Sequence, residues 1–236
     1  MLKNVKIKDF NMNRFFKPYV GKYYSEGING KRVLVIGNNF PCENGKDSQN
    51  CPYHEKCTDT ILKDSSCFNT ICPKWHKLGY KLEDQPFLNM DESTRAYKNF
   101  ADGISEVLGK NDFWEIWECM AFTNYVQFMV PKTIKKEAAK YLSERDFDSF
   151  LETIDELEPD IIVIWGSVIN TRLKERNKYV YDANELYKSD CFVCHMQYNG
   201  KNITLINCDH PSPINRYSWN KNLLKFQTYL KHELAI

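Results

Sequence analysis

The stretch Arg32-Val33-Leu34-Val35-Ile36-Gly37 decides the fold of this chain. Its apolar side chains follow one another without alternation, which is typical of a strand buried on both faces of a parallel sheet. Met120 to Val126 and Ile161-Ile162-Val163-Ile164-Trp165 repeat the pattern, and Asn202 to Asn207 is a further strand-like run. We therefore expect a central, mostly parallel sheet.

Amphipathic segments lie between these runs and carry helix-start and helix-stop signals. Ser93 or Thr94 can cap a helix that ends before Gly109, and Pro159 marks the end of another. The expected helices cover residues 9–25, 94–108, a short aromatic stretch from 112, 146–157, 167–176 and 218–234. Asn199-Gly200 between two strand-like runs predicts a hairpin at an antiparallel edge. Strands that alternate with helices indicate an α/β sandwich.

Composition and charge limit the class of protein. The 236 residues, 42% of them hydrophobic, suffice for a single domain over 1–236 with a cysteine-rich insertion at about 41–90. A net charge of +1 does not indicate an extended electrostatic nucleic-acid binder, although it leaves room for a local basic face. Because the chain lacks a bilayer-length apolar run and a secretory signal, we expect a cytoplasmic, bacterial protein with no membrane partner.

Polar residues follow the strands at their carboxyl ends, where α/β sheets bind ligands. Gly37-Asn38-Asn39 follows the first strand, Asn124 lies in the second, and Gly166-Ser167 joins the third to a helix N-terminus. The last strand leads into His210-Pro211-Ser212-Pro213, where two prolines stiffen the turn. Amides suit a base edge, and a helix N-terminus suits a phosphate. Each feature alone fits an ordinary turn or a satisfied buried amide, but together they indicate one site.

This combination resembles the uracil-DNA glycosylase superfamily. The resemblance runs from about Val33 to Leu224 and rests on GNN, the Asn in the second strand, VIWGS, HPSPIN and a following NKNLL. It implies a three-layer α/β/α sandwich around a four-stranded sheet, in a monomer that binds DNA. The implied reaction hydrolyses the N-glycosidic bond of a flipped nucleotide and leaves an abasic site. VIWGS and HPSP are most similar to the uracil-excising branch, whereas Asn39 paired with His210 is more similar to the single-strand-selective monofunctional branch.

The resemblance also implies a role for each candidate residue. Asn39 would position the attacking water, and His210 would donate a hydrogen bond to the departing base. Asn124 and Asn38 would contact the base edge, and either Phe40 or Phe68 would stack on the base. The DNA backbone would be contacted by Gly166, Ser167, Ser212 and Pro213, and the vacated stack would be filled by Ile214. The reaction needs no cofactor.

Two departures bear on the substrate and the chemistry. Uracil-specific members carry a tyrosine two positions after the catalytic residue, which rejects the thymine methyl group, and this chain has Pro41 there. A base larger than uracil is therefore an alternative substrate. Asn39 is neutral, so it would stabilise a sugar cation less than a carboxylate does.

The insertion raises a separate question of metal binding. Its five cysteines lie within 31 positions near His54 and His76, and can ligate zinc or an iron–sulfur cluster. These candidate ligands are Cys42, Cys51, Cys57, Cys67 and Cys72. Their spacing matches no known finger or ferredoxin pattern, so reduced thiols packed as small hydrophobes are the alternative. Cys191 and Cys194 form a C-x₂-C, but residues three apart on a strand face opposite sides.

Three hypotheses follow from the sequence. The first is a DNA glycosylase that acts on uracil or a related damaged or modified base. The second is a catalytically silent superfamily member that binds DNA or a protein partner. The third is an enzyme of the same fold that acts on unusual phage-type bases or free nucleotides.

Overall fold

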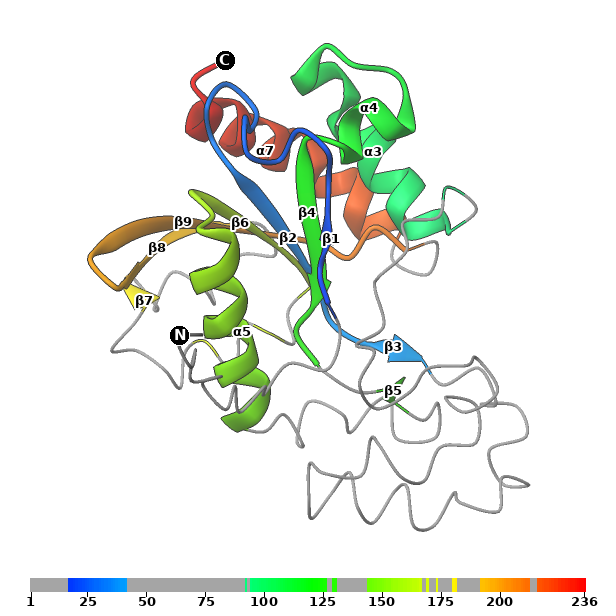
Figure 1. The fold of residues 1–236 in the computed structure, drawn as a ribbon. Helices are drawn as coiled ribbons and strands as arrows, with labels where there is room; N and C mark the ends of the chain where they lie inside the picture. The colour runs from blue at the N-terminus through cyan, green and yellow to red at the C-terminus, as the bar shows by residue number, and fades with distance from the viewer. Residues whose placement is uncertain are drawn as a thin grey trace, which may run out of the picture.

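Strand β2 (Val33–Gly37) lies inside a seven-stranded sheet, in agreement with its continuous apolar run (Figure 1). The computed structural model describes residues 17–41, 92, 94–126, 129–130, 144–166, 169, 173, 180–181, 192–212 and 216–236. All five residues of β2 are buried, and β2 pairs in parallel with β4 (Met120–Asn124) and β6 (Ile161–Trp165). Strand β6 pairs in parallel with β9 (Lys201–Cys208).

Three antiparallel strands extend this parallel core, so the sheet as a whole is mixed. Strand β1 (Tyr19–Val20) pairs with β4, β8 (Phe192–Tyr198) pairs with β9, and β7 (Val180–Tyr181) pairs with β8. The sheet is therefore larger and only partly parallel, compared with the expectation of four mostly parallel strands. A second, two-stranded sheet consists of β3 (Phe40–Pro41) and β5 (Met129–Val130).

The helix expected over residues 9–25 is wrong for its described part, residues 17–25. Tyr19–Val20 is a strand there, and turns follow it. The edge of β4 and the residues just before it explain the difference, because their carbonyl groups accept hydrogen bonds from this segment. Gly21 N–H donates to Met120 O, in β4, at 2.9 Å, and Tyr23 N–H donates to Glu118 O, two residues before β4, at 2.7 Å. Strand pairing thus outweighs the aromatic, helix-like sequence pattern.

The other described helices agree with their sequence signals. They are α3 (Arg95–Leu108), α4 (Phe113–Trp117), α5 (Glu144–Leu157) and α7 (Arg216–Leu234). Gly109 ends α3 with a φ of 63°, and Oδ1 of Asp112 accepts from the Trp114 and Glu115 N–H groups at the start of α4. Among the described residues, no helix has the length and apolar content needed to cross a membrane.

Two hydrophobic cores lie on the two faces of the sheet. Val33 and Val35 point to the first core, which α3, α4 and α7 cover with aromatic side chains such as Phe100. Leu34 and Ile36 point to the second core, which is covered by α5. Figure 1 shows α5 on one side of the sheet and the other three helices together on the opposite side.

The hairpin predicted at Asn199-Gly200 is confirmed. Both residues have positive φ, 48° and 77°, as a tight hairpin turn requires. The tip docks on α5, because Asp155 accepts hydrogen bonds from Tyr198 Oη at 2.9 Å and Asn199 Nδ2 at 2.8 Å. The antiparallel edge is therefore held to the helix layer beside it.

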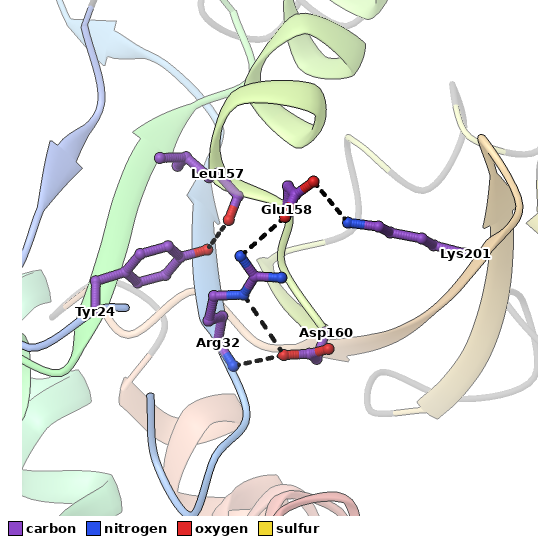
Figure 2. Close-up of polar contacts among 6 residues, drawn as sticks. All are labelled: Tyr24, Arg32, Leu157, Glu158, Asp160 and Lys201. Carbon is purple, nitrogen blue, oxygen red and sulfur yellow. Dashed lines mark hydrogen bonds and ion pairs between the residues drawn. The ribbon is translucent and has the colours of Figure 1, made fainter. Parts of the chain in front are cut away.

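A charged network joins the amino ends of β2, β6 and β9 (Figure 2). Glu158 bridges Arg32 Nη1 at 3.2 Å and Lys201 Nζ at 2.9 Å. Asp160 accepts a bond from the Arg32 backbone N–H at 2.8 Å. These groups hold the amino end of the sheet together, at the opposite end from the candidate residues.

Candidate functional site

The four parallel strands bring their candidate residues to one edge of the sheet. Gly37 pairs with Asn124, Gly166 directly follows β6, and His210 lies two residues after β9. Strand order β4-β2-β6-β9 separates the outer two strands by about 14 Å at ordinary strand spacing.

The Asn124 amide lies over Gly37. A Cβ atom at position 37 would overlap Oδ1 of Asn124 and would lie 2.9 Å from the Phe122 ring. Because β2 separates β4 from β6, an amide over Gly37 extends across the sheet in the direction of the His210 turn. Asn124 is 4% exposed, so its donor and acceptor groups are removed from bulk water.

His210 is held in one orientation by its own turn and by Trp165. The Ser212 backbone N–H donates to Nδ1 of His210 at 3.2 Å, and the imidazole meets the indole of Trp165 edge-on with 5.5 Å between ring centroids. An Nδ1 that accepts a hydrogen bond carries no proton, so the neutral ring has its proton on Nε2. His210 therefore presents an N–H donor at Nε2.

Two asparagines from different helices fix this turn. Nδ2 of Asn99 on α3 donates to Pro211 O at 2.7 Å, and Nδ2 of Asn222 on α7 donates to Oδ2 of Asp209 at 2.7 Å. Sequence reasoning missed both residues. Asn222 lies within the NKNLL motif that carries the resemblance, whereas no sequence signal marks Asn99.

Asn207 fixes the exit of β6, and sequence reasoning missed it as well. Its Nδ2 donates to Gly166 O at 2.8 Å and to Ile164 O at 3.2 Å, while Gly166 N–H donates to Cys208 O at 2.7 Å. Gly166 has a φ of 86°, a conformation that a side chain would strain. The strand exits that carry Gly166 and His210 are therefore tied together.

Asn38 and Asn39 lie between β2 and β3, and both are partly buried. Oδ1 of Asn38 is shielded from solvent and accepts no hydrogen bond from the described residues. Nε1 of Trp165 is also shielded from solvent, and it donates to no acceptor among the described residues. Phe40 belongs to β3. The site thus combines an N–H donor at His210, a buried amide at Asn124 and an acceptor at Asn38.

The remaining predicted site residues lie outside the described residues. They are Phe68, Ser167, Pro213, Ile214 and the cysteines Cys42, Cys51, Cys57, Cys67 and Cys72, together with His54, His76 and Cys191. Within the described ranges, no three side chains form a metal-binding group. On β8, Cys194 is buried while His195 is exposed.

Two cavities are lined by described residues other than the candidates. One of about 190 Å³ lies between α3 and α7 and includes Asn99 and Trp219. The other, of about 390 Å³, includes Tyr23, Cys119 and Ile236. Neither cavity is lined by Asn38, Asn39, Asn124 or His210. The candidate site is therefore defined by the positions of these side chains and not by a cavity.

No protein-family model matches this chain, and a search of curated proteins finds no match.

Proposed function

We propose that this chain is a DNA glycosylase that hydrolyses the N-glycosidic bond of uracil, or of a related damaged or modified base, flipped out of DNA. We also propose that its sheet and helices form the three-layer sandwich with a four-stranded parallel core of the uracil-DNA glycosylase superfamily. One observation carries the proposal: the hydrogen bond from Ser212 N–H to Nδ1 of His210, which leaves Nε2 as a donor. The product would be an abasic site.

The chemistry of base excision explains why such a donor matters. As the bond between C1′ and the base nitrogen breaks, the base takes up negative charge and the sugar becomes cationic. A preorganised N–H donor stabilises the oxygen on which that charge develops, and removing one such donor typically costs about 100- to 1,000-fold in rate. Nε2 of His210 is the donor in this scheme, and Asn99 and Asn222 keep its turn in place.

Base recognition follows from the neighbouring amides. Asn124 lies across Gly37, where its amide can both donate to and accept from a base edge. Asn38 Oδ1 is an acceptor without a described partner, so it can receive an N–H of the base. Asn39 would hold the attacking water. With Pro41 in place of the excluding tyrosine, bases substituted at C5 remain among the proposed substrates.

DNA is the proposed partner, bound by a monomer. Gly166, Ser167, Ser212 and Pro213 would contact its backbone, and Ile214 would fill the vacated stack. The reaction as proposed uses no cofactor. A zinc ion or iron–sulfur cluster held by the cysteine-rich segment would be structural, and metal analysis of the purified protein tests for it.

An excision assay tests the function directly. Oligonucleotides with one uracil, hypoxanthine, hydroxymethyluracil or modified cytosine are incubated with the protein as single and double strands, and abasic sites are then cleaved with alkali. We expect cleavage that falls at least 100-fold in His210→Ala and also falls in Asn39→Ala. His232→Ala is the matched control, because that imidazole is 83% exposed near the end of α7.

The outcomes separate the candidate functions. Absence of product from every base in both strand forms contradicts the glycosylase proposal. DNA binding without product would favour the catalytically silent alternative. Product from the modified pyrimidines alone would favour the phage-type alternative.

A further inference from the structure

The exposed side of α7 carries positive charge close to the candidate site. Lys221, Leu224 and Lys225 are exposed, and their spacing of three and four residues makes their side chains neighbours on one side of the helix. We call these three residues the α7 lysine face. Glu233, the one acidic residue in α7, does not compensate them, because its Oε2 accepts a hydrogen bond from Thr204 Oγ1 at 3.0 Å near the other end of the helix.

The buried side of the same helix sets the direction of this face. Trp219 and Phe226 belong to the core under α3, α4 and α7, and at about 3.6 residues per turn the two lysines lie on the opposite side of the helix. The same core contains Trp165, whose indole meets the imidazole of His210. The α7 lysine face therefore points to solvent from the helix layer that packs next to His210.

Helix α7 begins beside the candidate site. Asn222, in its second turn, donates to Asp209 at 2.7 Å, directly before His210. Its far end lies at the amino edge of the sheet, where Asn29 Nδ2 donates to Leu234 O at 2.8 Å, and Figure 1 shows the helix running between the two edges. Because Cα–Cβ bonds in a helix lean toward its N-terminus, the lysine side chains lean toward the carboxyl edge.

Exposed charges on the other long helices differ from those on α7. On α3, Lys98 Nζ lies 3.5 Å from Glu92 Oε1 and 3.8 Å from Asp102 Oδ1, so acidic neighbours compensate its charge. On α5, which covers the opposite face of the sheet, the exposed charged residues among the described side chains are acidic: Asp148, Asp155 and Glu156. The net charge of +1 thus combines helix faces of opposite sign, and a polyanion is attracted to α7 and repelled by α5.

A nucleic-acid backbone is the polyanion that fits the α7 lysine face. Lysines contact phosphates as point charges, and such contacts position a protein on DNA without reading its sequence. Leu224 is 74% exposed, and it is the one large apolar side chain exposed on α7 among the described side chains. A protein-docking face exposes a contiguous apolar patch on the order of several hundred Å². A single leucine beside two lysines fits the sugar between two phosphates instead.

We propose that Lys221 and Lys225 bind neighbouring phosphates on the DNA strand that flanks the flipped nucleotide, with Leu224 against the sugar between them. The two lysines are about 6 Å apart along the helix axis, which is close to the separation of neighbouring phosphates on one strand. The choice of DNA as the partner rests on the proposed function. The contact supplies affinity and a dependence on salt, whereas base selection stays with the residues around His210.

Binding to unmodified duplex DNA tests this face without any excision. Fluorescence anisotropy gives the affinity of the wild type and of the double variant Lys221→Gln/Lys225→Gln over a range of salt concentrations. Each neutralised phosphate contributes about 0.9 to the slope of log affinity against log salt, so we expect the slope of the double variant to be shallower by about 1.8. At about 0.1 M salt, its binding should be at least tenfold weaker. Lys221→Arg/Lys225→Arg keeps both charges and should keep the slope.

A matched control removes the same two charges elsewhere. Lys22 and Lys31 are exposed at the amino edge of the sheet, so Lys22→Gln/Lys31→Gln should leave the slope unchanged. An unchanged slope in the α7 double variant, an equal loss in the control, or a wild type that does not bind DNA overturns the proposal. If the wild type binds DNA but excises no base, the proposed function fails, and the slopes still decide the role of the α7 lysine face. Excision by the wild type with an unchanged slope in the α7 double variant rejects this face and leaves the function standing.

Discussion

Gly37 and Asn124 face each other across the β2–β4 pair, and the Asn124 side chain occupies the space that a side chain at position 37 would need. Glycine is therefore required at position 37 because it leaves space for the Asn124 amide. Its backbone angle is one that other residues also adopt. An apolar strand that ends in glycine thus determines the position of a polar group on its neighbour.

Gly37→Ala is expected to displace Asn124. Because the new methyl group overlaps Oδ1 of Asn124, the amide must rotate away, and we expect excision to fall about 10- to 100-fold, which corresponds to roughly 1.4–2.7 kcal/mol of transition-state stabilisation. Gly109→Ala is the control: it strains the positive φ that ends α3 without meeting any atom. It should cost about 1 kcal/mol of stability and leave the rate unchanged. Equal rates in both variants would contradict the role of Gly37.

Asn222→Ala is expected to loosen the His210 turn. The variant removes the 2.7 Å bond to Asp209, which should cost about 1 kcal/mol of folding free energy. Because the donor direction at His210 Nε2 then becomes less fixed, we expect roughly tenfold slower excision with DNA affinity nearly unchanged. Asn220→Ala, an exposed change on the same helix, should have neither effect. Urea denaturation and single-turnover kinetics measure the two quantities.

The central strands could be predicted from the sequence because burial on both faces leaves a continuous apolar run. Ile161–Trp165 shows this, since its predicted and observed bounds are the same. Strand β1 could not be predicted, because two residues at a sheet edge carry no periodicity of their own and depend on the carbonyl groups of β4. The sequence also predicts that Asn124, Gly166 and His210 follow or end parallel strands, and in the structure all three lie at the carboxyl edge of the sheet.

The supports of the site could not be predicted in the same way. Asn99 reaches Pro211 across 112 positions of sequence, and Asn207 acts through backbone carbonyl groups on another strand. A hydrogen bond of this kind depends on helix packing, and single asparagines in a helix or strand give no local signal for it. The sequence predicts Asp146 only as part of an amphipathic helix, whereas its complete burial depends on the packing of α5.

Acidification is expected to weaken the network in Figure 2. Hydrogen bonds from Lys201 and Arg32 lower the pKa of Glu158 below its ordinary value of 4.5. A lowered folded pKa means that Glu158 stabilises the fold above pH 4.5 and loses this contribution as the pH falls through the lowered pKa. Urea midpoints should therefore differ between wild type and Glu158→Gln at pH 7, and the difference should shrink as the pH falls below 4.5.

Salt and a control variant make this test specific. Since both partners of Glu158 are partly exposed, 1 M salt at pH 7 should reduce the difference. Glu106→Gln, an exposed change on α3, should show no such dependence on pH. A Glu158→Gln difference that stays constant from pH 7 to pH 3 would contradict the prediction.

Alkaline pH is expected to act on Tyr24, whose hydroxyl donates to Leu157 O at 3.1 Å near the end of α5 (Figure 2). Tyr24→Phe should cost about 1 kcal/mol at pH 7, because the bond is lost and the buried carbonyl keeps no replacement. Burial raises the pKa of Tyr24 above its ordinary value of 10.0, so its stabilising contribution is complete below pH 10 and declines as the pH rises further. The gap between wild type and Tyr24→Phe in urea midpoints should therefore narrow above pH 10. Tyr23→Phe is the control, because Tyr23 is 38% exposed and its variant should follow the wild type throughout.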